Sequence, residues 1–211
     1  MKDFNRIQEG ISKGNVSLIK ETVTALVEEG IAPLTIINDG LMIAMNEVGL
    51  RFKNGDMFVP EVMMSAKALS AGLELVKPLL STEDNISKGK VLIGTVRGDL
   101  HDIGKNLVAM MLESSGFTVI NMGVDISEEK FIEAVKEHQP DILGMSALLT
   151  TTMPAMETTI QAIQQAGLRE QVKIIVGGAP VSQKFAQEIG ADGYSGDAQE
   201  AIALCESLLA S

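Results

Sequence analysis

The second half of the chain alternates short apolar runs with helical segments, and this alternation restricts the fold more than any other feature. The runs are VLIGT at 91–95, TVIN at 118–121, DILGM at 141–145 and VKIIV at 172–176, with a weaker one near DGYSG at 192–196. Short, continuously apolar runs are typical of strands buried on both faces, and strands that alternate with helices indicate a parallel sheet. We therefore predict a Rossmann-like (flavodoxin-like), doubly wound α/β domain with a five-stranded parallel sheet over residues 89–211.

Residues 1–88 follow a helical period instead. Asn15 can cap a helix that ends near Gly30, Pro33 can open a second helix, and Pro60 can open a third. The apolar positions of the three helices recur at helical spacing: Ile19, Val23 and Leu26; Leu34, Ile37, Leu41, Met45 and Val48; Val62, Ala66, Leu69, Leu73, Val76 and Leu80. With a short helix near 3–12, these segments predict a four-helix bundle. The polar segment STEDNISKGK at 81–90 is interpreted as a linker.

Composition narrows the classes of function. The chain of 211 residues has 28 acidic and 17 basic side chains, a net charge of -11, one tyrosine and no tryptophan, which disfavours nucleic acid as a partner. The apolar runs are too short to span a bilayer, and the N-terminus lacks a secretory apolar segment. The single cysteine, Cys205, excludes an internal disulfide and is interpreted as a buried apolar residue. We expect a cytoplasmic protein without membrane contact.

Unusual residues gather at the ends of four consecutive predicted strands. The segments are RGDLHDIG at 97–104, NMGVD at 121–125, SALLTTT at 146–152 and GGAP at 177–180. Because ligands of open α/β folds bind at the carboxyl ends of the strands, these segments predict a shared binding site. Glycine lets the backbone approach a ligand closely, and serine and threonine supply small hydroxyl groups. The pattern indicates a slot with one imidazole, that of His101, at its mouth.

The surroundings of His101 favour a metal ligand. A metal-binding imidazole works best when its second nitrogen donates to a carboxylate, and Asp99 can reach that nitrogen. A hydroxyl from the neighbouring strand end can then hold Asp99. A bare zinc ion would need three or four protein ligands, but the only other histidine, His138, is expected at a helix end that faces solvent. One histidine suffices if the metal brings its other ligands in a tetrapyrrole-like macrocycle.

The loop alone leaves another interpretation open, in which Asp99 and His101 only tie a strand to a helix. A nucleophilic triad is disfavoured because no serine or cysteine stands on a sharp strand-to-helix turn beside this histidine. The glycines of the loop do not form the dinucleotide-binding pattern either.

Three segments together resemble a known family. Asp99-x-His101-x-x-Gly104, Ser146-x-Leu148 and Gly177-Gly178 resemble the signature of cobalamin-binding domains that hold the cofactor base-off with histidine on. The segment at 45–69, MNEVGLRFKNGDMFVPEVMMSAKAL, is similar to the helical cap of methionine synthase and of small corrinoid proteins in methylotrophic and acetogenic methyltransferase systems. The resemblance covers nearly the whole chain, and implies a cap domain at 1–88 and a corrinoid-binding domain at 89–211.

The resemblance implies roles for individual residues. His101 would be the lower axial ligand of cobalt, Asp99 would bind its other nitrogen, and Thr152 would complete the relay where methionine synthase has a serine. Phe58, with Val62 and Met63 nearby, would cover the upper face. The implied cofactor-binding residues are Phe58, Gly98, Asp99, His101, Asp102, Ile103, Gly104, Ser146, Leu148, Thr150, Gly177 and Gly178.

The resemblance also implies a function and partners. The chain would carry a methyl group on a cobalamin or related corrinoid that cycles between cob(I)amide and methylcob(III)amide. It would take the group from a substrate-specific corrinoid methyltransferase and pass it to an acceptor methyltransferase that serves tetrahydrofolate or coenzyme M, with a reductive activase as a further partner. It would be a carrier subunit and no complete enzyme alone, and the linker at 81–90 would be a hinge for the cap.

Three other functions stay open. A cobalamin-dependent regulator would normally carry a DNA-binding module, but the sequence shows no basic helix-turn-helix segment. A small cobalamin-binding subunit of a mutase would share the histidine loop but not the helical cap. A flavodoxin-like module without a cofactor would leave the three segments without a common explanation. The methyl donor, the acceptor, the oligomeric state and the lower base of the corrinoid are not determined by the sequence.

Overall fold

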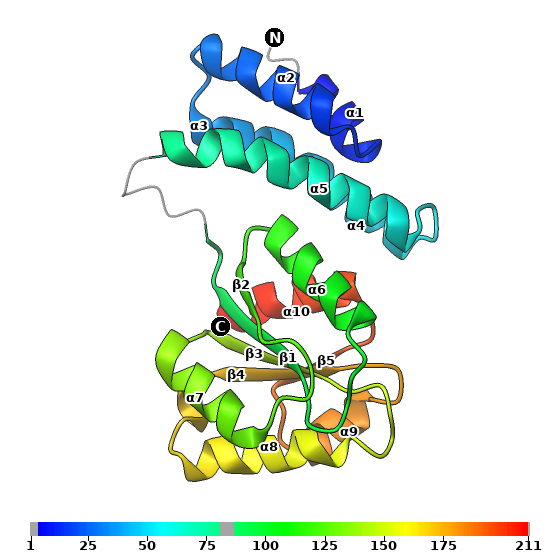
Figure 1. The fold of residues 1–211 in the computed structure, drawn as a ribbon, viewed down its shortest axis with the longest axis vertical. Helices are drawn as coiled ribbons and strands as arrows, with labels where there is room; N and C mark the ends of the chain where they lie inside the picture. The colour runs from blue at the N-terminus through cyan, green and yellow to red at the C-terminus, as the bar shows by residue number, and fades with distance from the viewer. Residues whose placement is uncertain (1–3, 81–86, 211) are drawn as a thin grey trace. The chain divides into compact units, whose positions relative to one another are not determined.

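The structure, a computed structural model, describes residues 4–80 and 87–210. Two compact units divide these residues (Figure 1): a helical one with the residues before 81, to which Ser114–Gly116 are also assigned, and a larger one with Ser87–Glu113 and the residues from Phe117 onward. Most of the predicted linker, residues 81–86, lies outside the described part, so its interpretation as a hinge stays a prediction.

The N-terminal unit is helical, as predicted. Its elements are α1 (Asn5–Ser12), α2 (Val16–Glu28), α3 (Pro33–Thr35), η1 (Ile36–Met42), α4 (Ile43–Lys53), α5 (Val59–Val76) and η2 (Lys77–Leu79). Asn15 caps α2, because its Oδ1 accepts the Leu18 N–H at 3.1 Å. Pro60 lies in the first turn of α5, where a missing N–H leaves no partner unsatisfied. The caps that the sequence predicted therefore set these helix starts.

The helix predicted from Pro33 differs in its hydrogen bonding. Its middle part, η1, is a π-helix, which bonds each N–H to the carbonyl five residues back. The fully covered residues there are Ile36, Ile37, Gly40 and Leu41, whereas Leu34 is only half-buried. Gly40 lies so close to α1 that a Cβ would stand 2.9 Å from the Ile7 Cδ1. The α-helical period used on the sequence does not describe this turn.

The second unit contains the predicted five-stranded, all-parallel sheet. The strands are β1 (Lys90–Thr95), β2 (Thr118–Asn121), β3 (Ile142–Ser146), β4 (Lys173–Gly177) and β5 (Gly193–Ser195). Their order is β2-β1-β3-β4-β5, and all four pairings are parallel. This is the flavodoxin-like order, with its switch point between β1 and β3. The fold class is therefore confirmed, and the strand limits differ from the prediction by about one residue at most ends.

Helices cover both faces of the sheet. They are α6 (Ile103–Ser114), α7 (Glu128–His138), α8 (Pro154–Gln165), η3 (Arg169–Gln171), α9 (Gln183–Glu188) and α10 (Ala198–Leu209). Figure 1 shows α6 and α10 on one face and α7, α8 and α9 on the other. The buried core on the second face includes Leu92, Leu143, Ile174 and the fully buried Phe131. This packing leaves the carboxyl ends of the strands and their loops free to form a site.

Two smaller expectations concern single residues. Cys205 is fully buried in α10, and burial first, then the nearby Glu206 carboxylate, raise the pKa of its thiol to about 12. His138 is the last residue of α7, as predicted, but it is half-buried rather than facing solvent. Within residues 4–80 and 87–210, the helices are all too short or too polar to cross a lipid bilayer.

Candidate functional site

The predicted site residues begin at one row across the sheet. Thr95, Ser146, Gly177 and Ser195 are register partners in succession, from β1 through β3 and β4 to β5. The row lies at the carboxyl end of each strand, and the loops that follow these ends carry the other predicted residues. The parallel register therefore brings together Ser146 and Gly177, which the sequence separates by a whole strand-helix unit.

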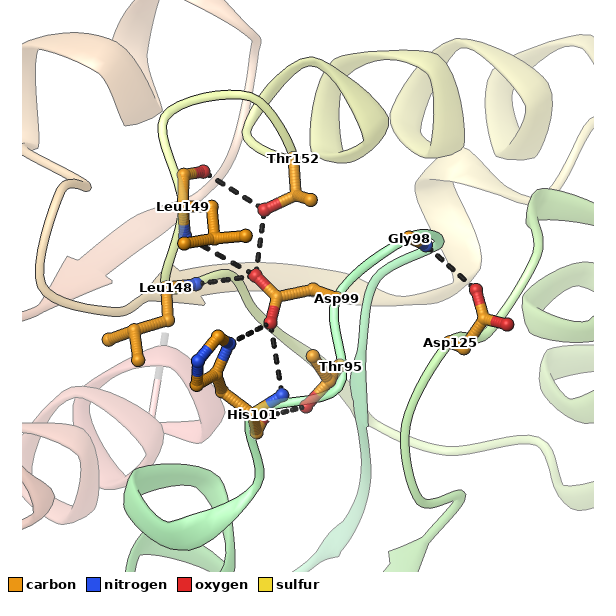
Figure 2. Close-up of polar contacts among 8 residues, drawn as sticks. All are labelled: Thr95, Gly98, Asp99, His101, Asp125, Leu148, Leu149 and Thr152. Atoms are coloured by element: carbon orange, nitrogen blue, oxygen red, sulfur yellow. Dashed lines mark hydrogen bonds and ion pairs between the residues drawn. The ribbon is translucent and has the colours of Figure 1, made fainter.

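Asp99, in the loop after β1, receives hydrogen bonds from the loop after β3 and from its own loop (Figure 2). Its Oδ2 accepts the hydroxyl of Thr152 at 2.7 Å and the backbone N–H of Leu148 at 2.8 Å, with the Leu149 N–H at 3.3 Å. Its Oδ1 accepts the His101 backbone N–H at 3.0 Å. The loop after β3 thus supplies the hydroxyl partner that was predicted for Asp99 and adds two backbone N–H donors to the same oxygen.

The Asp99 side chain is fully buried and remains ionised. Burial by itself raises the pKa of Asp99, but the hydrogen bonds from Thr152, Leu148 and His101 outweigh it, and the pKa lies well below its usual value. A carboxylate that accepts several hydrogen bonds is held in its charged form. A fixed negative charge therefore stands inside the loop at neutral pH.

The His101 imidazole stands between this charge and solvent. Its Nδ1 lies 2.7 Å from the Asp99 Oδ1, and its side chain is 51% exposed. Figure 2 shows the ring extending from the carboxylate with its second nitrogen directed away. Because the Asp99 carboxylate can only accept, Nδ1 is the donor in this contact, and Nε2 is the ring nitrogen that faces away from Asp99. The His101 carbonyl also accepts the hydroxyl of the buried Thr95 at 2.9 Å, which anchors the loop behind the ring.

The glycines of the site meet two different conditions. A Cβ on Gly104 would meet nothing within 4 Å, so the surface beside His101 is open there. Gly178 has φ +124° and lies against the loop after β3, where a Cβ would fall 1.9 Å from the Ala147 carbonyl oxygen. Contacts within the protein, without any ligand, therefore require glycine at position 178. Gly98 has φ +80°, a left-handed conformation that glycine adopts without strain.

Four other predicted binding residues lie in the same loops. Leu148 supplies its N–H to Asp99 and leaves its side chain 43% exposed, and Ile103 is 79% exposed at the start of α6. The Asp102 carboxylate accepts the Asn106 side-chain amide at 2.9 Å, and its carbonyl accepts the Asn106 N–H. Thr150 is exposed. Asp102 is thus engaged in holding the first turn of α6, while Leu148 and Ile103 offer apolar surface near His101.

The three candidate residues of the helical unit differ in exposure. Phe58 and Met63 are 70% and 55% exposed, whereas Val62 is fully buried. The Phe58 N–H donates to the Glu61 Oε2 at 2.9 Å and so caps α5. Phe58 and Met63 present apolar surface; Val62 does not.

Sequence reasoning missed three residues that shape the loop. The Thr95 hydroxyl donates to the His101 carbonyl, and the Leu149 N–H donates to the Asp99 carboxylate. The Asp125 carboxylate accepts the Gly98 N–H at 2.7 Å. Asp125 lies in NMGVD, a strand end already singled out, but nothing in the spacing assigned it a partner. The contact depends on two loops that follow different strands.

In the described part of the chain, at this site or away from it, no group of three or more His, Cys, Asp or Glu side chains is arranged to hold a metal ion. The His101 ring contacts the Asp99 carboxylate on one side and is half-exposed to solvent.

Comparison with known proteins gives consistent matches over both units. Two family models, each described as a B12 binding domain, match residues 89–203 and residues 4–77. The dimethylamine corrinoid protein of Methanosarcina barkeri is 46% identical over 199 residues, which are 92% of this chain and 93% of the relative. A corrinoid protein of Desulfitobacterium hafniense is 38% identical, with 99% of this chain and 98% of the relative covered.

Solved structures agree with these matches. The methanol:cobalamin methyltransferase complex of Methanosarcina barkeri contains a chain with a TM-score of 0.88 and 32% identity, over 99% of this chain and 80% of that one. A cobalamin-binding protein of Desulfitobacterium hafniense has a TM-score of 0.81 and 33% identity, over 98% of both chains. With its Asp99–His101 pair at the carboxyl edge of a flavodoxin-like sheet, the chain belongs to the family of small corrinoid proteins of methyltransferase systems, which have B12-binding domains.

Proposed function

We propose that this protein is a methyl carrier that binds a corrinoid with His101 as the lower ligand of cobalt. In this function a substrate-specific methyltransferase delivers the methyl group, and a second methyltransferase removes it. The protein would act as the subunit that travels between the two enzymes, with a reductive activase to restore the cofactor after oxidation.

The Asp99–His101 pair carries the proposal. A buried, ionised carboxylate at 2.7 Å from Nδ1 fixes the tautomer that leaves Nε2 as a donor toward a metal. A pair that only tied strand to helix would need neither a half-exposed imidazole nor a carboxylate with this many hydrogen bonds.

The donor set and the surface beside it fit a corrinoid. A single imidazole suits a metal that brings its remaining ligands in a macrocycle, and the open space over Gly104 leaves room for a flat group. Ile103 and Leu148 would lie against its apolar edge, and Ser146 and Gly177 would line the slot between the strand ends. When bound, the corrinoid supplies a cobalt centre that accepts and releases methyl groups.

The protein's own part in the reaction would be to hold and orient the imidazole. Asp99 keeps Nδ1 of His101 hydrogen-bonded, and Thr152 holds Asp99 in turn. With a corrinoid bound, His101 would hold the metal through Nε2, and the Asp99–Thr152 pair would keep the ring in the orientation that this requires.

The names of the relatives support the class of methyl donor. Proteins 46% identical are named for dimethylamine, and a chain with 32% identity belongs to a complex named for methanol. We therefore propose a small methylated amine or alcohol as the source of the methyl group. The methanol complex also supports a donor methyltransferase as the direct partner.

The first test is an absorption spectrum of the protein incubated with hydroxocobalamin and then desalted. We expect one corrinoid per chain with imidazole bound to cobalt, and loss of the bound-imidazole spectrum in His101→Ala. His138→Ala is the matched control, because it removes the other histidine of the chain. If the wild type retains no corrinoid, or if His101→Ala has the same spectrum as the wild type, the proposal is wrong.

The donor is tested with the loaded, reduced protein. It is mixed with purified methanol, monomethylamine or dimethylamine methyltransferase and the matching substrate, and the methylated cobalt spectrum is recorded. A carrier gains a methyl group from one of the three at a rate at least tenfold above that without the enzyme. Preference for adenosylcobalamin with no methylation by any donor enzyme would favour the mutase interpretation instead.

A further inference from the structure

The segment Asn121–Asp125, which begins at the last residue of β2, contacts the His101 loop at both ends. This segment includes the sequence NMGVD, which the function described above does not use. It runs beside the end of β1, where the Thr95 N–H donates to the Gly123 carbonyl and the Ile126 N–H to the Thr95 carbonyl, both at 3.0 Å. The two loops are therefore fixed to each other before any side chain is considered.

The first contact is at the start of the His101 loop. The Asp125 Oδ1 accepts the Gly98 N–H at 2.7 Å, and the Asp125 N–H donates to the Asp99 carbonyl at 3.1 Å. Asp125 has φ +53°, a left-handed conformation that is unfavourable for a residue with a side chain. An aspartate in this conformation places its carboxylate on the backbone N–H of Gly98 and its own N–H on the backbone carbonyl of Asp99.

The second contact is at the end of the loop. Lys105, in the first turn of α6, is only 3% exposed, and its ammonium donates to the Asn121 Oδ1 at 2.6 Å and the Asn106 Oδ1 at 2.7 Å. The Asn121 side-chain amide also donates to the Asn106 Oδ1 at 2.9 Å. A buried ammonium needs these acceptors, so α6 cannot shift away from the end of β2 without loss of satisfied hydrogen bonds.

Between the two contacts lie Asp99 and His101. We propose that Asp125 and Asn121 are positioning residues that set the orientation of the His101 ring from the β2 side, as the loop after β3 does from the other side. Neither touches the ring. Their effect reaches it through the backbone of Gly98–Asp99 and through the first turn of α6. This inference rests on the proposed function only for its effect on cobalt ligation, because the ordering of the loop is a property of the chain itself.

Four variants test the proposal. Asp125→Gly removes the carboxylate and keeps an unstrained left-handed backbone, and Asp125→Asn keeps an oxygen that can accept the Gly98 N–H. Asn121→Ala removes the second contact. Asp141→Ala is the matched control, because the exposed Asp141 accepts the Lys90 N–H at 2.8 Å at the opposite end of the sheet.

The first measurement is amide hydrogen exchange, by nuclear magnetic resonance, in the protein without corrinoid. We expect the Gly98 and His101 amides to exchange about threefold to tenfold faster in Asp125→Gly, since one exposed hydrogen bond of this kind contributes about 1 kcal/mol. Asn121→Ala should speed exchange at the start of α6 by a similar factor. Asp125→Asn and Asp141→Ala should leave His101 within about twofold of the wild type. Equal exchange in wild type and Asp125→Gly, or equal acceleration in Asp141→Ala, would overturn the proposal.

The second measurement is the fraction of bound imidazole in protein loaded with hydroxocobalamin. We expect the ratio of imidazole-bound to imidazole-free cobalt to fall at least threefold in Asp125→Gly, and Asp125→Asn to recover it. An unchanged ratio in Asp125→Gly would show that the contact orders the loop without positioning the ligand, and would overturn the proposal too. If the wild type itself binds no corrinoid, the proposed function fails, while the exchange data still decide whether the segment orders the loop.

Discussion

The two edges of the sheet use the same chemical group for different purposes. At the amino-terminal edge, the Asp141 carboxylate accepts the Lys90 N–H at 2.8 Å, and its backbone bonds both to Lys90 and to Lys173. At the carboxyl edge, the Asp99 carboxylate accepts N–H groups of the loop after β3. Asp141 is exposed, whereas Asp99 is fully buried and also faces the His101 ring.

The difference shows how a function is recognised from geometry. A surface carboxylate that accepts the first N–H of a strand, as Asp141 does, is explained by its contribution to stability alone. A buried charge is unfavourable unless it is satisfied by hydrogen bonds, and a fold that needed only to join two loops could use a neutral side chain. The carboxyl edge therefore holds a buried charge in hydrogen-bond contact with an imidazole.

The largest expected effect at the carboxyl edge is that of Gly178→Ala. A Cβ there would stand 1.9 Å from the Ala147 carbonyl oxygen on a backbone with φ +124°, so overpacking and strain add. We expect the free energy of unfolding to fall by about 3–5 kcal/mol in urea denaturation. The control Gly167→Ala, with φ +73° and no atom within 4 Å, should lose only about 1–2 kcal/mol. Similar losses in the two variants would contradict the close contact.

Asp99→Ala should come next. The Thr152 hydroxyl and the N–H groups of Leu148 and His101 would lose their acceptor in a buried position. We expect a loss of about 3 kcal/mol in the free energy of unfolding at pH 7, against about 1 kcal/mol for Asp141→Ala. Equal losses would mean that the two edges are alike.

The stabilisation by Asp99 should depend on pH. Because the pKa of Asp99 is lowered on folding, the unfolded chain binds the proton more readily, and stability from this group is present above about pH 4. It is lost as the pH falls toward the folded-state pKa. The difference in free energy of unfolding between wild type and Asp99→Asn should therefore shrink between pH 6 and pH 3. A difference that stays constant or grows over this range would show that the folded-state pKa is not lowered.

Thr152→Val should have the smallest effect of the set. Thr152 is 8% exposed, and its hydroxyl donates to the Asp99 Oδ2 at 2.7 Å. We expect a loss of about 1–2 kcal/mol for the valine variant and less than about 1 kcal/mol for Thr152→Ser, which keeps the hydroxyl. A valine variant as stable as the serine variant would indicate that Leu148 and Leu149 suffice to hold Asp99.

Much of the site was predictable because its residues follow local rules. His101 and Asp99 are two positions apart in a loop after a buried strand, and Thr152 lies in the next strand-end segment along the sheet. Strand-helix alternation brings the loops after parallel strands to one edge of the sheet, so a hydroxyl partner for Asp99 could be expected, and the resemblance to corrinoid proteins implied that Thr152 supplies it. The exposures of Val62 and Phe58 could not, because both lie on an apolar stretch and only packing separates them.

By itself, the sequence determined the parallel α/β fold, the helical N-terminal half and the pairing of Asp99 with His101. The apolar period and the strand-end residues carry this information over short distances. Only the tertiary structure decided that Gly178 is required by the Ala147 carbonyl, that a π-helical turn interrupts the helix after Pro33, and that Asp125 and Asn121 contact Gly98 and Lys105 on either side of His101. These features arise from contacts between loops and helices far apart along the chain, whose distances no local pattern records.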